Sequence, residues 1–323
     1  MRYKAPLSGF LLTGLLSALT PPMARATPPQ RIVEGWYAHN ATLILLGATD
    51  RIVATVDSPK RVPWMFRLVP RLNDATLLDV PMMNAEEMLR LKADLVFVMQ
   101  STHSATALRA AGVKAVEEGF STFQGLMDCV TSTAALLEDP LAQARAQDYV
   151  GALKIELAKS PSLEGRAPPR VLHIQSLTPL KVDGDGTIID EWIRAAGGRM
   201  AAQNVHGNMQ PVTIEQVIAW NPDIIIVGAH AGDIAPLKND PLWRQVAAVQ
   251  AGHVYRNPEG VFAWDRYGPE LLLQLQWARG IISGKGVDRP AMMARIRAFY
   301  ARFYDIRLSE EDAGRILDAQ PPG

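Results

Sequence analysis

The sequence predicts two Rossmann-like α/β lobes with parallel-rich central sheets, joined by a single long helix, with a ligand cleft between the lobes. Apolar runs of strand length alternate with helical patterns along the first part of the chain, and this alternation begins again near residue 170. The run at residues 95–99 is apolar throughout, which is typical of a parallel strand covered by helices on both faces. Two βα series in one chain indicate two lobes of similar construction.

The first series supplies the elements of the first lobe. Apolar runs predict strands, and amphipathic stretches that end near a glycine or before a strand predict helices. The strands are expected at residues 31–34, 51–55, 95–99 and 114–117, and the helices at residues 37–46, 85–91, 106–111 and 123–137.

A long helix is expected to connect the lobes. Residues 140–158 contain no proline or glycine except Pro140 and Gly151, and proline suits a first helical turn. Because a helix is stiffer than a Gly/Ser tether, it holds two lobes at a nearly fixed separation. The chain then divides into a signal peptide (residues 1–26), an N-terminal lobe (27–139), a connecting helix with its linker (140–165), and a C-terminal lobe with terminal helices (166–323).

The second series repeats the construction of the first. It predicts strands at residues 170–175, 224–227 and 253–256, and helices at residues 188–196 and 214–219. Residues 83–98 and 212–227 share one pattern: a polar cap, a glutamate, a helical turn, an aspartate and four apolar strand residues. One copy lies in each lobe at an equivalent place, which favours a ligand site between the lobes.

The N-terminus has the pattern of a secretory signal peptide. Arg2 and Lys4 precede a short apolar run, which ends in Ala24-Arg25-Ala26. The run is too short for a comfortable membrane span. We expect cleavage near Ala26 and a mature chain that works outside the inner membrane.

Composition excludes some classes of protein. The 33 basic and 33 acidic side chains give a formal net charge of zero, whereas a nucleic-acid binder needs a basic face. Cys129 is the only cysteine, so no internal disulfide can form and core packing must stabilise the fold. With 48% hydrophobic residues the chain can build such a core.

We expect the mature protein to be a monomer.

Several segments, taken in order, resemble the periplasmic substrate-binding proteins of ABC importers. The resemblance is to the helix-linked (class III) family that carries iron–siderophores, haem and vitamin B12, and it covers nearly all of the mature chain. It implies two lobes joined by one long helix, a periplasmic location, and an inner-membrane ABC permease as partner. The matching segments include Asn84-Ala85-Glu86, Arg170-Val171-Leu172-His173, Gly186-Thr187-Ile188-Ile189-Asp190, Ala196-Gly197-Gly198, Asn221-Pro222-Asp223-Ile224-Ile225 and Pro258-x-Gly260 through Trp264 to Glu270.

The resemblance also implies a role for one acidic residue in each lobe. Glu86 and Glu215 begin the helices of the repeated pattern, where family members meet arginines of the permease. Two carboxylates on two lobes, held apart by a stiff helix, suit a permease with two-fold symmetry. The alternative is that each carboxylate only stabilises its helix N-terminus, by about 0.3–1 kcal/mol. Glu87, beside Glu86, is positioned to share the docking role.

The cleft is expected at the loops that follow strand carboxyl ends, where open α/β sheets bind ligands. Aromatic residues there offer apolar walls with a polar handle, and arginine suits an anionic chelate. His103 and His206 are candidates to complete the coordination of a metal. The candidate ligand-binding residues are Trp36, Tyr37, Trp64, His103, His206, Met209, His230, Trp264, Arg266 and Tyr267.

The cargo predicted first is a metal chelate, of the ferric siderophore type. Haem or cobalamin is the first alternative, and a bare zinc, manganese or nickel ion held by histidine and Asp265 is the second. A secreted enzyme is the last alternative, because the sequence contains no Gly-x-Ser-x-Gly, His-Glu-x-x-His or phosphate-binding Gly-x-x-x-x-Gly-Lys-Ser/Thr motif. We therefore assign no catalytic residue and expect no covalent cofactor.

Overall fold

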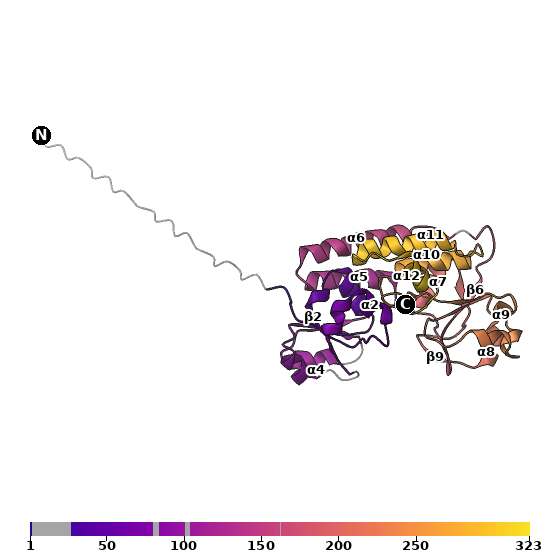
Figure 1. Ribbon diagram of the computed structural model, residues 1–323, viewed down its shortest axis with the longest axis horizontal. Helices are drawn as coiled ribbons and strands as arrows, with labels where there is room; N and C mark the ends of the chain where they lie inside the picture. Colours follow the sequence, from indigo (N-terminus) through magenta and orange to yellow (C-terminus); the bar gives the residue numbers. More distant parts are fainter. Residues whose placement is uncertain (2–26, 80–83, 101–103, 162) are drawn as a thin grey trace.

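Two α/β lobes lie side by side, and a group of helices runs along one side of both lobes (Figure 1). The computed structural model describes residues 1, 27–79, 84–100, 104–161 and 163–323. The expected signal peptide lies outside these residues apart from Met1.

The first lobe is built on an all-parallel sheet of five strands in the order β3-β2-β1-β4-β5. Because parallel strands end at one edge, the loops after them meet there. The strands are β1 (Ile32–Gly35), β2 (Ile52–Thr55), β3 (Thr76–Leu77), β4 (Leu95–Met99) and β5 (Ala115–Glu118). The helices are α1 (His39–Leu45), α2 (Pro63–Leu68), α3 (Ala85–Arg90), α4 (Ser104–Ala110) and α5 (Phe123–Leu136).

The second lobe has a mixed sheet in the order β11-β10-β6-β7-β9, with β8 paired to β6. The strands β6, β10 and β11 run parallel, whereas β7 and β9 are antiparallel additions that the sequence did not predict. The strands are β6 (Arg170–Leu177), β7 (Leu180–Val182), β8 (Arg199–Met200), β9 (Gln210–Pro211), β10 (Ile224–Val227) and β11 (Val254–Arg256). The helices are α7 (Ile188–Ala195), α8 (Ile214–Trp220) and α9 (Ala247–Gln250).

The lobes are joined by α6 (Pro140–Leu157), whose 18 residues span about 27 Å. The side chain of Asp139 caps its first turn by accepting from the Leu141 amide at 2.9 Å. The terminal helices α10 (Leu271–Ile282), α11 (Arg289–Phe299) and α12 (Glu310–Leu317) follow the second lobe in the chain. In space α10 packs against α6 and α11 packs against α10 (Figure 1), and one hydrophobic cluster combines residues of both lobes with these helices.

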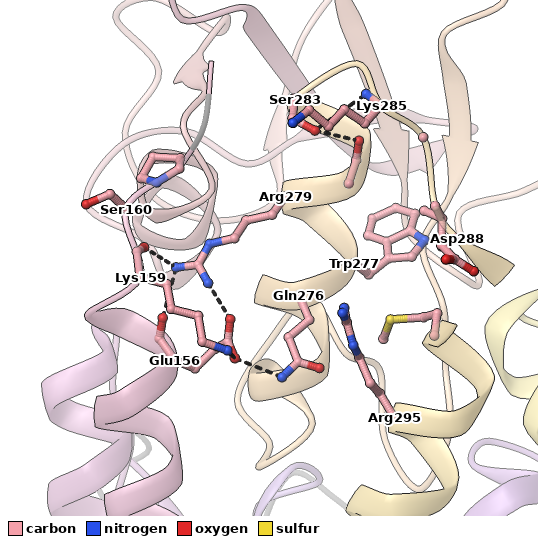
Figure 2. Close-up of a pocket in the computed structure, with 15 residues that line it drawn as sticks. Glu156, Lys159, Ser160, Gln276, Trp277, Arg279, Ser283, Lys285, Asp288 and Arg295 are labelled. Atoms are coloured by element: carbon pink, nitrogen blue, oxygen red, sulfur yellow. Dashed lines mark hydrogen bonds and ion pairs between the residues drawn. The ribbon is translucent and has the colours of Figure 1, made fainter. Parts of the chain in front are cut away.

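A buried carboxylate fixes the end of α6 to α10 (Figure 2). The side chain of Glu156, only 6% exposed, forms an ion pair with the Arg279 guanidinium. It also accepts hydrogen bonds from the Gln276 amide at 2.9 Å and the Lys159 ammonium at 2.7 Å. Arg279 also donates to the backbone carbonyls of Glu156 at 3.0 Å and Lys159 at 2.9 Å. These bonds hold the connecting helix against the second lobe, which favours a stiff joint.

The repeated helix–strand pattern has a structural cause in both lobes. The carboxylate of Asp94 accepts the amides of Gln30 at 2.7 Å and Arg31 at 2.9 Å, just before β1. In the second lobe Asp223 accepts the amide of Arg170, the first residue of β6, at 2.8 Å. Each aspartate therefore ties its helix–strand turn to the start of the neighbouring strand.

Candidate functional site

A cavity of about 570 Å³ lies between the two lobes. Its first-lobe residues come from the ends of β4 and β5, the start of α5 and the loop after β1, all near the carboxyl edge of the sheet. This volume falls within the range of about 300–1,000 Å³ that small-molecule sites occupy. The lining residues are Trp36, Met99, Gln100, Gly119, Phe120, Ser121, Thr122 and Gly125 from the first lobe, and Asn208 and Tyr267 from the second.

Three aromatic rings form a continuous wall of this cavity across both lobes. The ring centroid of Trp36 lies 5.8 Å from that of Phe120 and 5.7 Å from that of Tyr267. Phe120 and Tyr267 are themselves 5.7 Å apart, edge to face. The Tyr267 hydroxyl accepts a hydrogen bond from the Asn208 amide at 2.7 Å. The wall offers an apolar surface with amide and hydroxyl groups at its margin, a combination suited to an organic ligand.

A buried histidine supports the first-lobe side of the wall. His39 stacks on Trp36, and its Nδ1 lies 2.6 Å from a carboxyl oxygen of Glu34 while its Nε2 lies 2.9 Å from the Thr133 hydroxyl. The other oxygen of Glu34 accepts the Trp36 amide at 2.9 Å. Burial raises the pKa of Glu34 above its ordinary value.

A network of charges supports the second-lobe side. Asp183 accepts the Arg266 guanidinium at 2.8 Å, His173 Nδ1 at 2.8 Å and, through its other oxygen, the Met209 amide at 2.9 Å. His173 Nε2 lies 2.9 Å from Asp265 Oδ2, which is within ion-pair distance, but the angles do not meet the geometry of a hydrogen bond. Asp183 thus holds the loop that carries Asn208 through the Met209 amide and the loop that carries Tyr267 through Arg266.

The charged groups of this network shift one another's pKa values. Burial alone would raise the pKa values of Asp183 and Asp265, but the Arg266 guanidinium and His173 together outweigh burial and lower both. Burial alone would lower the pKa of His173, but the two carboxylates raise it above its ordinary value. Arg266, which the sequence offered as a partner for an anionic chelate, is 8% exposed and already paired.

The other predicted aromatic residues have different surroundings. Tyr37 is half-buried, with the guanidinium carbon of Arg61 3.4 Å from its ring centroid. The prediction for two tryptophans needs correction, because both are core residues and neither lines the cavity. Trp64 is 2% exposed and donates to the Gln320 carbonyl at 2.8 Å, while Trp264 is fully buried and donates to Glu270 at 3.1 Å.

The remaining predicted residues that the structure describes do not line the cavity. His206 is exposed and paired with Asp185, and His230 lies 2.7 Å from Glu259. Met209 is 48% exposed, and none of the three lines the cavity. His103 lies outside the described residues. Within the described part of the chain, no three His, Cys, Asp or Glu side chains form a group that could hold a metal ion.

Phe120 and Asn208 line the cavity but were not among the predicted ligand-binding residues. Phe120 follows β5, and the rule that placed candidates after the other parallel strands also applies to the strand expected at 114–117. No local signal marks Asn208, because its position depends on the contact of Met209 with Asp183.

The two glutamates proposed for docking are exposed in the first turns of equivalent helices. Glu86 belongs to α3, which precedes β4, and Glu215 belongs to α8, which precedes β10. Glu87 is instead paired with Arg90, with Nε at 3.0 Å. A hydrogen bond from the Thr213 side chain lowers the pKa of Glu215.

The helix-linked lobes and the cavity between them define a two-lobed ligand-binding protein. A profile of the periplasmic binding protein family matches residues 33–260, and the chain belongs to this family. The chain is also similar to solved structures of the same fold. A periplasmic solute-binding protein from Veillonella parvula superposes with a TM-score of 0.78 at 23% identity, over 90% of this chain and 92% of that one.

Two named relatives bind different ligands. The molybdate-binding protein MolA of Haemophilus influenzae is 25% identical, over 90% of this chain and 91% of its own length. A solved structure of MolA with molybdate, described as the cognate periplasmic binding protein of an ABC transporter, gives a TM-score of 0.72 at 22% identity, over 88% of this chain and 96% of that one. The vitamin B12-binding protein of Salmonella typhi is 30% identical over 50% of this chain and 60% of its own length. Across the described residues, no helix has the length and apolar character needed to span a membrane.

Proposed function

We propose that this protein binds a metal chelate between its lobes and delivers it to an ABC permease, without catalysing a reaction. The aromatic cavity shared by both lobes is the observation that carries the proposal. Stacked aromatic rings and amide groups recognise the organic shell of a chelate, and a ferric siderophore-type complex is the first candidate. The protein works as a periplasmic monomer after removal of a signal peptide near Ala26.

Cobalamin is the second candidate, because the vitamin B12-binding relative is 30% identical over half of the chain. A bare metal ion is less well supported, since the described residues contain no group of metal-ligating side chains. Molybdate, the ligand of the MolA relative, requires its own test.

The cargo can be identified by mass spectrometry and metal analysis of protein purified natively from the periplasm. The same cargo, added to the stripped protein, should stabilise it by about 2.7 kcal/mol at a hundredfold excess over Kd. Thermal unfolding measures this gain, and mass spectrometry of the recovered ligand should find it unchanged. A ligand that is converted to product would instead support an enzyme.

Glu86 and Glu215 are proposed to dock on the permease. Their exposed positions on equivalent helices support this role, and the pairing of Glu87 with Arg90 leaves one carboxylate for docking in each lobe. The double change Glu86→Arg and Glu215→Arg should abolish cargo uptake by cells and leave the cargo Kd of the purified protein unchanged. Each single change should reduce uptake in part. Equal loss of uptake and affinity would mean that the two residues are structural.

A further inference from the structure

Two features beside the cavity have the chemistry to bind an anion, and the protein's own carboxylates occupy both. The first is the guanidinium of Arg266, next in the chain to the lining residue Tyr267. The second is the N-terminus of α5, a helix of 14 residues that begins beside the lining residue Thr122. Either would attract an oxyanion if it were open to the cavity.

Arg266 is neutralised within the second lobe. Its guanidinium pairs with Asp183 at 2.8 Å and Asp265 at 3.4 Å, and all three side chains are at least 90% buried. His173, the fourth member, lies between the two carboxylates. Two carboxylates face one guanidinium and at most one imidazolium, so the network has no net positive charge in either protonation state of His173.

The N-terminus of α5 is capped from the opposite lobe. The carboxylate of Glu191, in the first turn of α7, accepts the amide of Phe123, the first residue of α5. The Thr122 hydroxyl accepts the Gly125 amide at 3.0 Å. The positive end of this helix dipole is therefore already matched by a fixed negative charge.

Within the described part of the chain, the cavity lining adds no compensating charge. Every described residue that lines it is uncharged, and the acidic Glu118 immediately precedes the lining residue Gly119. An oxyanion entering this site would lose its hydration without gaining a cation, which is unfavourable in a partly buried cavity.

We infer that the cavity excludes oxyanions and strongly anionic complexes and selects cargo whose net charge is neutral or positive, because Asp183, Asp265 and Glu191 occupy the two anion-binding features beside it. This inference rests on the proposed function for its cargo class, a metal chelate, and restricts that class by charge. It separates the protein from its molybdate-binding relative despite similarity over most of the chain.

The first experiment removes the negative charge that occupies the N-terminus of α5. Glu191→Gln removes the charge at the N-terminus of α5, and the matched control Glu310→Gln removes an exposed charge on α12. Isothermal titration with sodium molybdate should show a tighter Kd for Glu191→Gln than for the wild type, by up to about thirtyfold, the largest effect of a partly buried helix terminus. The Glu310→Gln control should behave as the wild type. Micromolar molybdate binding by the wild type, or no gain in affinity in Glu191→Gln, would overturn the inference.

The second experiment needs no variant, so it remains valid if Glu191→Gln does not fold. Quenching of tryptophan fluorescence compares a neutral ferric trihydroxamate with a trianionic ferric tricatecholate on the wild-type protein. The neutral complex should bind at least about tenfold tighter, which corresponds to 1.4 kcal/mol. Equal or tighter binding of the trianion would overturn the inference and leave the proposed chelate function intact. If neither complex binds, the proposed ferric cargo is wrong, and the molybdate titration still decides whether the cavity excludes anions.

Discussion

Both lobes place a buried histidine behind the cavity, but the partners of the two histidines differ. In the first lobe His39 lies between the Glu34 carboxyl and the Thr133 hydroxyl and stacks on the aromatic wall. In the second lobe His173 lies between two carboxylates, Asp183 and Asp265, that both also pair with Arg266. One wall therefore depends on stacking and short hydrogen bonds, whereas the other depends on charge.

The pKa values of the buried carboxyl groups near His39 and near His173 are shifted in opposite directions for this reason. Burial raises the pKa of Glu34, and burial raises the pKa of Asp57 to about 7. In the second lobe Arg266 and His173 together outweigh burial and lower the pKa values of Asp183 and Asp265. A buried carboxyl without a cation favours its neutral form, and a buried carboxylate beside a guanidinium favours its charge.

The largest effect is expected from Asp183→Asn. This change leaves Arg266 and His173 with one carboxylate and weakens the hold on both cavity loops, so the free energy of unfolding should fall by about 3–5 kcal/mol. Cargo affinity should fall with it, because Asn208 and Tyr267 lose their support. Urea unfolding measures the loss, with the exposed Asp79→Asn as control. A loss no larger than that of the control would show that charge does not hold the second wall.

An intermediate effect is expected from Asp57 and depends on pH. Its ordinary pKa is 3.8 and its folded pKa is about 7, so the folded state binds more protons between these values and stability falls as pH rises from about 4 to 7. Asp57→Asn should remove this part of the slope and stabilise the protein at pH 8 by about 1–3 kcal/mol.

Thermal unfolding of wild type and Asp57→Asn from pH 4 to pH 8 tests this prediction. Glu270, whose pKa burial also raises to about 7, contributes the same slope to both proteins, so their difference isolates Asp57. Parallel stability curves for the two proteins would contradict the assignment.

The smallest effect is expected from Glu34→Gln. The amide oxygen of glutamine can accept the Trp36 amide, and a neutral side chain suits a site where burial already disfavours the charge. The free energy of unfolding should fall by no more than about 1 kcal/mol, the value of one hydrogen bond. Urea unfolding beside Asp183→Asn gives the comparison, and an equal loss in both variants would remove the contrast between the lobes.

Much of the fold could be predicted from local patterns. The continuous apolar runs at Leu95–Met99 and Ile224–Val227 are the strands β4 and β10 with the expected bounds. The stretch that begins at Pro140 is the helix α6, one residue shorter than expected. The antiparallel β7 and β9 were not predicted, because strands of two or three residues carry too little periodicity.

The candidate site was predicted less completely. The rule that ligands bind beyond strand carboxyl ends indicated Trp36 and Tyr267, which line the cavity. The same rule also indicated Trp64 and Trp264, because an aromatic residue in a loop has the same sequence signal whether it lines a cavity or packs in the core.

By itself the sequence determined the main parallel strands, the repeated pattern in the two lobes and the helix that connects them, because periodicity, capping and chain breakers act over a few residues. Tertiary structure alone decided which charges remain open to a ligand. Asp183 and Arg266 are 83 residues apart in the chain, and Glu191 meets Phe123 across 68 residues. Such pairs form only when separate elements pack together, and between packed elements of low dielectric a nearby carboxylate determines whether a guanidinium or a helix end can attract an anion.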